Sequence, residues 1–425
     1  MASVVAHIAA GDRRIATGSR VLRILAAIRE EPTDVQALTL AIWSVPLSIA
    51  VTEFFLSAAL FCKIIRCARG RDHIALPRAF WFWLAWAGLT CVAWGLSHEP
   101  IAGWSAIRRT FLIAALFLVV PALKKSSLLL FAWKGVFITS AFGSLFLIGD
   151  FVSRWSYYRR ELAGGGDAGF YLRSGGLLNH WMVFGTVEIL VVGGMLAFWF
   201  VFPEQRRRWW AAFLINGLAI VLSLTRMTWV SSFFLLGLVL ALRRSRWLWA
   251  LPAMAVGFYL LAPGAVRSRL RDSVRGDYYP NLERVQMLRV GWNMIKQHPL
   301  AGVGAGRIQE TYRSYLAPSD PVPAYHGHLH NNLVQVAAES GVPTAVAAVV
   351  FCVILLVDIG RSCKVAATEE GQFLSLAALL ALSGFLLAGL FDYTYGHSLG
   401  LILLAFGVLP ALLVNFRRGA PNTSS

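Results

Sequence analysis

The stretch that decides the fold is WWAAFLINGLAIVLSLTRMTWVSSFFLLGLVLAL, residues 209–242. It contains 34 residues and a single charged side chain, Arg226, near its middle. One α-helix of that length would extend about 50 Å, whereas the hydrocarbon core of a bilayer is about 30 Å thick. The stretch therefore predicts two short membrane helices that turn at Arg226, with this arginine at the membrane surface.

Similar apolar runs recur along the chain, which is 57% hydrophobic and 14% charged, with a mean hydropathy of +0.61. Soluble chains are about 45–50% apolar and about 25% charged. Only helices let such runs satisfy their backbone hydrogen bonds in lipid. We therefore predict an all-α polytopic membrane protein that forms one integral-membrane domain over residues 1–425. Residues 35–66 could form one tilted helix, but Pro46 and Ser48 offer a break. The twelve expected spans are 35–49, 51–66, 79–97, 104–122, 127–149, 180–202, 209–225, 227–242, 246–263, 331–357, 372–392 and 396–416.

The net charge of +17 comes from short basic clusters between the apolar runs. Clusters follow every even-numbered run, and short cytoplasmic loops of membrane proteins are enriched in Lys and Arg. This alternation predicts a multi-pass protein of the bacterial inner membrane with both termini in the cytoplasm. Because the charges form no single patch, nucleic acid is not an expected partner. The clusters lie at 63–78, 124–125, 206–208, 243–246, 361–364 and 417–418.

Two of the odd-numbered gaps are long and are predicted to face the periplasm. The first periplasmic loop covers 150–179, and the large periplasmic loop covers 264–330. The large loop contains nine Lys or Arg residues. Long loops escape the charge bias that orients short ones, so this excess calls for an anionic ligand on the outer face.

The large loop and the run after it contain an ordered series of motifs. Glu283-Arg284 comes first, and His298-Pro299-Leu300-Ala301-Gly302-Val303-Gly304-Ala305-Gly306 follows. His330-Asn331-Asn332 then leads into Gln335, Glu339 and Gly341. Together with Ser223-Leu224-Thr225-Arg226, this order resembles the shared core of the superfamily of O-antigen ligases, O-antigen polymerases and protein O-oligosaccharyltransferases. The resemblance covers about 60 residues and implies a GT-C-like fold with its active site in the periplasm.

The resemblance implies a transferase that needs no metal and no other cofactor. Its donor would be O-antigen linked to undecaprenyl pyrophosphate, and its acceptor a sugar hydroxyl of lipid A–core oligosaccharide. His330 is the expected catalytic base, because a neutral imidazole can accept the hydroxyl proton. Considered alone, a histidine here would more often be a helix cap or a core residue. Asn331, Gly302 and Gly304 are expected to support the site.

Arginine residues are the expected ligands of the pyrophosphate, because the guanidinium group stays charged and can bind phosphate oxygens bidentately. We expect Arg226 and Arg284 to bind the donor and Arg307 to add a contact. The simpler interpretations are a snorkelling anchor for Arg226 and a solvated loop charge for Arg284. For Arg108 and Arg109, which begin the fourth span, binding of lipid headgroups is the favoured interpretation.

Two other sites suggest themselves but are disfavoured. His326, His328 and His330 alternate, as in a metal site, but no nearby carboxylate or cysteine in the sequence completes the ligand set. Gly302, Gly304 and Gly306 lack the strand–turn–helix context of a nucleotide loop and fit a tight backbone turn.

Three other functions remain open. An O-antigen polymerase uses the same donor with a second lipid-linked glycan as acceptor, and a protein O-oligosaccharyltransferase uses a Ser or Thr hydroxyl. One dominant outer loop favours the ligase, because polymerases of this kind commonly have two comparable loops. A transporter or flippase would usually show two related halves and charges at mid-membrane, and the sequence shows neither.

Overall fold

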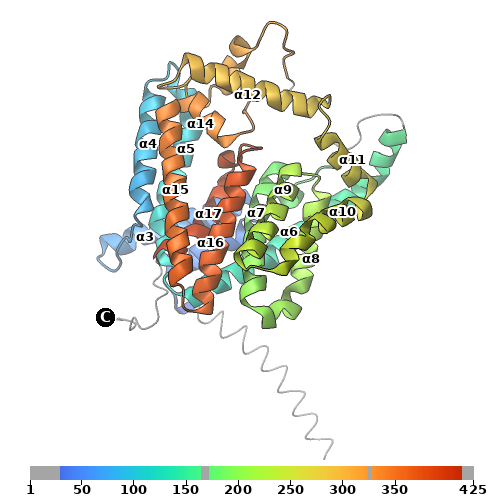
Figure 1. Cartoon of the computed structure of the whole chain (residues 1–425). Helices are drawn as coiled ribbons and strands as arrows, with labels where there is room; N and C mark the ends of the chain where they lie inside the picture. Colours follow the sequence, from blue (N-terminus) through green and yellow to red (C-terminus); the bar gives the residue numbers. More distant parts are fainter. Residues whose placement is uncertain (1–28, 164–171, 324–326, 414–425) are drawn as a thin grey trace, which may run out of the picture.

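A computed structural model describes residues 29–163, 172–323 and 327–413 of the chain. Secondary structure in this part is helical throughout, without a strand, which confirms the all-α class. A bundle of upright helices is crossed at one end by α12 (Figure 1). The helices outside the segment that joins α10 to α15 are α2 (Thr33–Ser44), α3 (Ile49–Ala68), α4 (Ala79–Gly95), α5 (Trp104–Val119), α6 (Ser126–Ala163), α7 (Trp181–Val201), α8 (Arg206–Leu222), α9 (Arg226–Leu242), α10 (Leu251–Leu261), α15 (Val342–Val365), α16 (Glu369–Ala388) and α17 (Ser398–Leu413). The segment between α10 and α15 forms α11 (Gly264–Ser273), α12 (Tyr279–Gln297), α13 (Ile308–Thr311) and α14 (Asn332–Ser340).

Each of the twelve predicted runs contains a helix, and the chain is a membrane protein by helix length and composition. Five helical segments of the described part are long and apolar enough to cross a membrane, and further apolar helices are shorter. The number of twelve spans stays a prediction. The five long segments are Pro100–Ala122, Ser126–Glu161, Trp181–Val201, Val342–Val365 and Glu369–Ala388.

The predicted breaks at Pro46 and before Arg226 are confirmed. Helix α2 ends at Ser44 and α3 begins at Ile49, while α8 and α9 are separated by a turn in which Leu224 has a φ of 52°. This sharp turn divides the run between α8 and α9, which have 17 residues each; α8 begins three residues before the run, at Arg206.

Two predicted boundaries are wrong. The run 331–357 is not one helix, because the chain breaks at Gly341, where φ is 86°, and α14 and α15 lie on either side. An added Cβ at Gly341 would lie 2.1 Å from the Leu300 carbonyl oxygen, so the break also allows close packing. Residues 150–163, predicted as the start of a loop, prolong α6.

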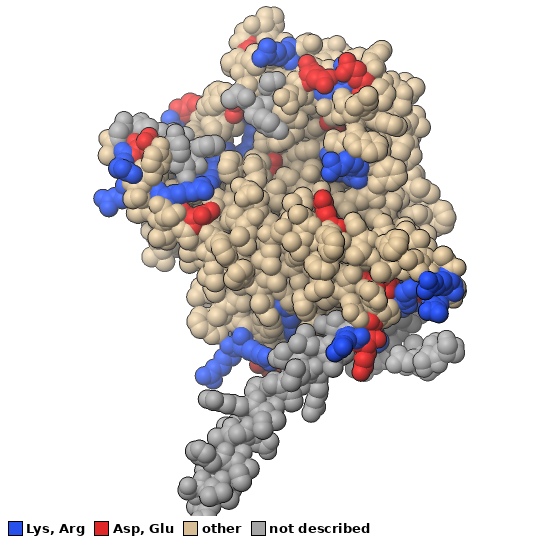
Figure 2. All heavy atoms as spheres, turned by 180° about the vertical axis from the view of Figure 1, so that it is seen from behind, with Lys and Arg blue, Asp and Glu red and all other residues tan. Residues whose placement is uncertain are grey.

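The charge distribution agrees with a membrane protein. In Figure 2 the Lys, Arg, Asp and Glu side chains gather toward the two ends of the molecule and leave a broad, mostly uncharged belt between them. Helices α7 and α16 form the centre of the bundle, since 72% of the apolar window of each is buried. Only 22% of the window of α15 is buried, as expected for a helix that faces lipid.

Candidate active site

The His330-Asn331-Asn332 segment joins the start of α14 to the turn that follows α16. The Asn331 side chain caps α14 by accepting hydrogen bonds of 3.0 Å from the Leu333 and Val334 N–H groups. Asn332 donates from its backbone to the Gly389 carbonyl at 2.7 Å and from its side chain to the Thr394 hydroxyl at 2.8 Å. Two segments about 60 residues apart in sequence are thereby held side by side.

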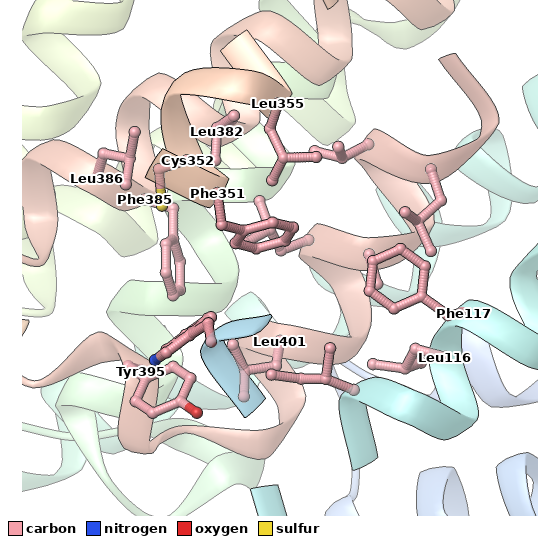
Figure 3. A pocket seen from close by; sticks show the side chains of 16 residues that line it. Leu116, Phe117, Phe351, Cys352, Leu355, Leu382, Phe385, Leu386, Tyr395 and Leu401 are labelled. Atoms are coloured by element: carbon pink, nitrogen blue, oxygen red, sulfur yellow. The ribbon is translucent and has the colours of Figure 1, made fainter. Parts of the chain in front are cut away.

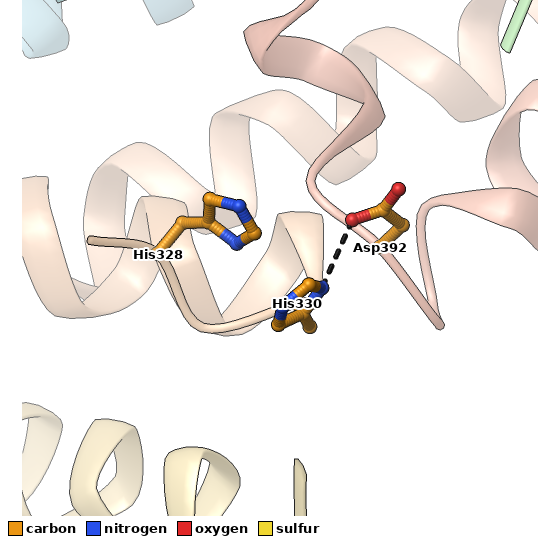
Figure 4. Close-up of side chains that lie close together, drawn as sticks. All are labelled: His328, His330 and Asp392. Atoms are coloured by element: carbon orange, nitrogen blue, oxygen red, sulfur yellow. Dashed lines mark hydrogen bonds and ion pairs between the residues drawn. The ribbon is translucent and has the colours of Figure 1, made fainter. Parts of the chain in front are cut away.

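That connection brings His330 against Asp392. The imidazole Nδ1 lies 3.0 Å from Asp392 Oδ1, and the two side chains are 13% and 3% exposed (Figure 4). With Nδ1–H donating to the carboxylate, the lone pair of the neutral ring is on Nε2. His330 also has a φ of 49°, a left-handed conformation uncommon for a residue with a side chain. The geometry therefore suits a base whose orientation is set by a buried acid.

Asp392 is ionised in this environment. Burial raises the pKa of its carboxyl group, but the hydrogen bond and charge of His330, nearby His397 and the Tyr393 N–H lower it more, so the net shift is downward. The anion stabilises the imidazolium that forms when His330 accepts a proton.

Arg226 is the first residue of α9 and is held by the large outer segment. Its Nη1 donates to Asn281 Oδ1 at 2.6 Å. Asn281 is fixed in turn, because its amide donates to the backbone carbonyls of Asp272 and Arg275 at 3.0 and 2.9 Å. Arg226 thus lies where α9 meets the start of α12, at the end of an apolar helix.

Arg284 lies one helical turn after Asn281 on α12. The charges of both Arg226 and Asp392 act on its guanidinium. Burial, and then repulsion by Arg226, lower the pKa of its guanidinium to about 10, while Asp392 acts in the opposite direction. Met287, Val290 and Met294 form the apolar face that packs α12 onto the neighbouring outer helices and so positions Arg284. The structure therefore places Arg226, Arg284 and the His330–Asp392 pair in one electrostatic environment, and the roles predicted for the three basic residues stay predictions.

Arg307 has different partners from those expected. Its Nε lies 3.1 Å from Glu310, and its Nη2 lies 3.9 Å from Glu99. A guanidinium between two carboxylates has little residual charge for a phosphate, so this contact is weakly supported.

The glycine motif is a packing turn, as predicted. Gly302 and Gly304 have φ values of 71° and 107°, and a Cβ on Gly302 would lie 2.3 Å from the backbone of Glu339. The backbone N–H of Gly304 donates to the Glu339 carbonyl at 3.1 Å, and that of Gly306 donates to the Glu339 carboxylate at 3.1 Å. These glycines fix the end of α14; their support of the site stays a prediction.

Arg109 was wrongly expected to bind headgroups. Its guanidinium lies inside the protein, 5.5 Å from the Tyr393 ring and 5.3 Å from the Tyr395 ring. Tyr393 directly follows Asp392 in the sequence. Asp392 itself was missed. Its signal was an acid at the outer end of an apolar run, but nothing in the sequence indicates that it meets His330.

The three histidines need a correction as well. His328, His330 and Asp392 each offer a ligand atom within 4.8 Å of one another, so a carboxylate does complete a possible set (Figure 4). Two histidines and one carboxylate match the ligands of some catalytic zinc sites. Burial and nearby His330 lower the pKa of His328 to about 3, so it is neutral near pH 7. His326 lies outside the described residues.

Two apolar pockets are lined in part by the elements that carry this site. One, of about 100 Å³, is lined by residues such as Trp86, Phe117 and Phe351, reaches Tyr395 and contains no charged side chain (Figure 3). The other, of about 990 Å³, is lined mainly by α8, α9, α10 and α11, including Trp229 and Leu270. Neither lining suits a glycan, but the second pocket lies along the helix that begins with Arg226.

Comparison with known proteins supports the resemblance seen in the sequence. Residues 211–349 match a protein-family model described as O-antigen ligase. The matched segment contains Arg226, Arg284 and His330, but not Asp392. No curated protein matches the chain significantly.

Proposed function

Because residues 211–349 belong to the O-antigen ligase superfamily, we propose that the protein transfers a glycan from undecaprenyl pyrophosphate to a sugar hydroxyl of lipid A–core oligosaccharide. The observation that carries the proposal is the 3.0 Å contact between His330 and Asp392, next to two arginines without a carboxylate partner among the described residues. A positioned base and a cationic phosphate site are the two parts that such a transfer needs.

The proposed step is a direct displacement. His330 Nε2 accepts the proton of the acceptor hydroxyl, and the oxygen attacks the anomeric carbon of the donor sugar. The bond from that carbon to the phosphate oxygen breaks, and undecaprenyl pyrophosphate departs with inversion of the anomeric centre. Arg226 and Arg284 neutralise the departing pyrophosphate, while Asp392 stabilises the imidazolium.

The apolar groove of about 990 Å³ supports a lipid-linked donor. Trp229 lies one turn after Arg226 on α9, so a cationic site and an apolar groove adjoin at the same helix. An amphipathic pyrophosphate lipid needs both features, whereas a water-soluble nucleotide sugar needs only the first.

In this proposal the large outer segment, residues 264–330, faces the periplasm of a bacterium and both termini lie in the cytoplasm. A reporter that is active only in the periplasm should be silent when fused after Arg246 and active when fused near Pro318. The reverse pattern would place the active site on the wrong side for a lipid A–core acceptor.

A metal-dependent transfer is the specific alternative, favoured by the cluster of His328, His330 and Asp392. We propose a metal-independent step, because the activated donor already carries the energy and the His330–Asp392 contact orients the base. Transfer by the purified protein should survive treatment with a strong chelator. Loss of transfer that added zinc restores would instead assign these side chains to a metal.

The acceptor distinguishes the ligase from its relatives. Purified protein would receive glycan on undecaprenyl pyrophosphate together with core lipopolysaccharide, a second donor molecule or a Ser/Thr-containing protein. We expect glycan on core lipopolysaccharide alone. A lengthened lipid-linked glycan would identify a polymerase, glycosylated protein would identify a protein O-oligosaccharyltransferase, and no transfer with any acceptor would contradict the proposal.

A further inference from the structure

Arg269 on α11 lies beside the two arginines discussed above, and the sequence did not single it out. Its Nη1 donates to the Tyr278 hydroxyl at 2.6 Å. The Tyr278 ring lies 5.8 Å from the Arg269 guanidinium and 5.9 Å from that of Arg226. The Tyr278 ring is therefore within cation–π range of both guanidinium groups.

The three arginines of this region share one electrostatic environment. Arg226 and Arg269 both repel the Arg284 guanidinium and contribute to its lowered pKa. Like charges held close together are unfavourable unless a counter-ion joins them. Arg269 therefore belongs to the same cationic cluster as Arg226 and Arg284.

Nearby carboxylates are engaged elsewhere. Asp277 and Asp272 lie 2.8 and 4.0 Å from Arg275, and Asp320 lies 3.3 Å from Arg289. Arg226, Arg269 and Arg284 form no ion pair with a described residue, whereas Arg275 and Arg289 do. Asp272, Asp277 and Asp320 thus form no ion pair with the cluster. Glu283 and Asp392 act on Arg284 only through their charge, without an ion pair.

Two donors of the cluster are buried without an acceptor in the described part of the chain. They are Nη2 of Arg226 and Nε of Arg269. Buried charged donors are rarely left unsatisfied in a folded protein, so these two N–H groups call for an anionic acceptor. Both are guanidinium nitrogens, which suits phosphate oxygens.

We propose that Arg269 is a third pyrophosphate-binding arginine, which holds the phosphate nearer the lipid, and that Tyr278 is a positioning residue for it. This inference rests on the proposed function. The assignment to the lipid side follows from α11, whose Leu270 and Arg271 line the apolar groove next to Arg269. Arg284 instead interacts with Asp392 and so lies on the side of the reacting sugar.

The test measures binding of undecaprenyl phosphate and of undecaprenyl pyrophosphate to the purified full-length protein. Arg269→Gln should weaken binding of both lipids by about tenfold to a hundredfold, the effect of losing a charge-assisted hydrogen bond. Arg284→Gln should weaken pyrophosphate binding far more than monophosphate binding. Tyr278→Phe, which keeps the ring and removes the hydroxyl acceptor, should cause a smaller loss for both lipids.

Arg267→Gln is the matched control, since Arg267 lies on the same helix, is exposed, and its side chain makes no hydrogen bond or ion pair with a described residue. If the Arg269→Gln and Tyr278→Phe proteins both bound the two lipids as well as this control does, the inference would be overturned. A loss confined to the pyrophosphate lipid would overturn the lipid-side assignment. If the unaltered protein itself showed no preference for pyrophosphate over phosphate, the proposed function would fail, independently of Arg269.

Discussion

Lys63 and Arg66, near the end of α3, and Arg226 and Arg284, near α12, are all cations beside an apolar bundle, but they differ in their partners. Lys63 is 1% exposed and lies 2.7 Å from Asp72, and Arg66 lies 2.6 Å from Asp34. Arg226 and Arg284 form no ion pair with a described residue.

Burying a charge is unfavourable unless a partner compensates it. At the end of α3, carboxylates of the protein itself compensate the buried cations, so the function of this cluster is structural. The arginines near α12 form no such ion pair within the described part of the chain, and in the proposed function a bound anion compensates them. If that proposal holds, the contrast separates residues that stabilise the protein from residues that bind substrate, although both sets are basic and partly buried.

The largest effect is expected at His330, which tests whether the outer cluster performs chemistry. His330→Ala should lower the rate of transfer by about 10² to 10⁴ fold, because it removes the base. Donor binding should persist, since the imidazole is not a phosphate ligand. Asp392→Asn is the companion variant, expected to lower the rate less and to shift its pH dependence.

Single-turnover transfer and equilibrium binding of undecaprenyl pyrophosphate would be measured on the same preparations. If His330→Ala lost donor binding and kept its single-turnover rate, the division of labour between His330 and the arginines would be wrong.

The contrast also shows how far sequence could predict this site. Arg226 was predictable, because one charge within 34 apolar residues must lie at a membrane surface. His330 and Arg284 were proposed from motifs that resemble those of the superfamily, and their roles stay predictions. Asp392 was not predictable, because its contact with His330 depends on hydrogen bonds between Asn332 and a turn about 60 residues away.

The positions of the helices were predictable because local hydrophobic runs determine them directly. The break at Gly341 was missed because Val342 and the residues after it continue the apolar pattern, although Gly341 and Pro343 form a local signal for a helix boundary. The close contact with Leu300 adds a tertiary reason for the turn. The buried position of Arg109 likewise depends on Tyr393 and Tyr395, which approach it from another helix connection.

An intermediate effect is expected for Arg284→Gln, which tests the claim that the outer arginines lack an internal partner. Binding of undecaprenyl pyrophosphate should weaken by about tenfold to a hundredfold. Thermal stability without ligand should stay unchanged or rise, because the substitution relieves repulsion by Arg226. Arg307→Gln is the control from the same segment: its guanidinium has carboxylate partners, so its effect on binding should be small. A marked loss of stability in Arg284→Gln with normal binding would remove the distinction between the two clusters.

The smallest effect on binding, and the largest on stability, is expected for Asp72→Asn at the end of α3. Removing the carboxylate leaves Lys63 buried without its counter-ion, which typically costs about 3–5 kcal/mol. Donor binding should be unchanged in protein kept below its unfolding temperature. Lys124→Gln is the matched control, since Lys124 lies 2.9 Å from the same carboxylate but its side chain is 63% exposed. That variant should lose less than about 1 kcal/mol.

The stability of the protein at low pH gives a second test of this last prediction. Burial raises the pKa of Asp72, but hydrogen bonds from Lys63 and Lys124 lower it more, so the folded protein holds this carboxyl ionised to a lower pH than the unfolded chain does. A depressed carboxyl pKa contributes stability above the unfolded value of about 3.9 and loses it as pH falls through the folded value. The unaltered protein should therefore lose stability below about pH 4 more steeply than Asp72→Asn does. Parallel acid profiles for the two proteins would show that Asp72 is not the counter-ion that stabilises this end of the bundle.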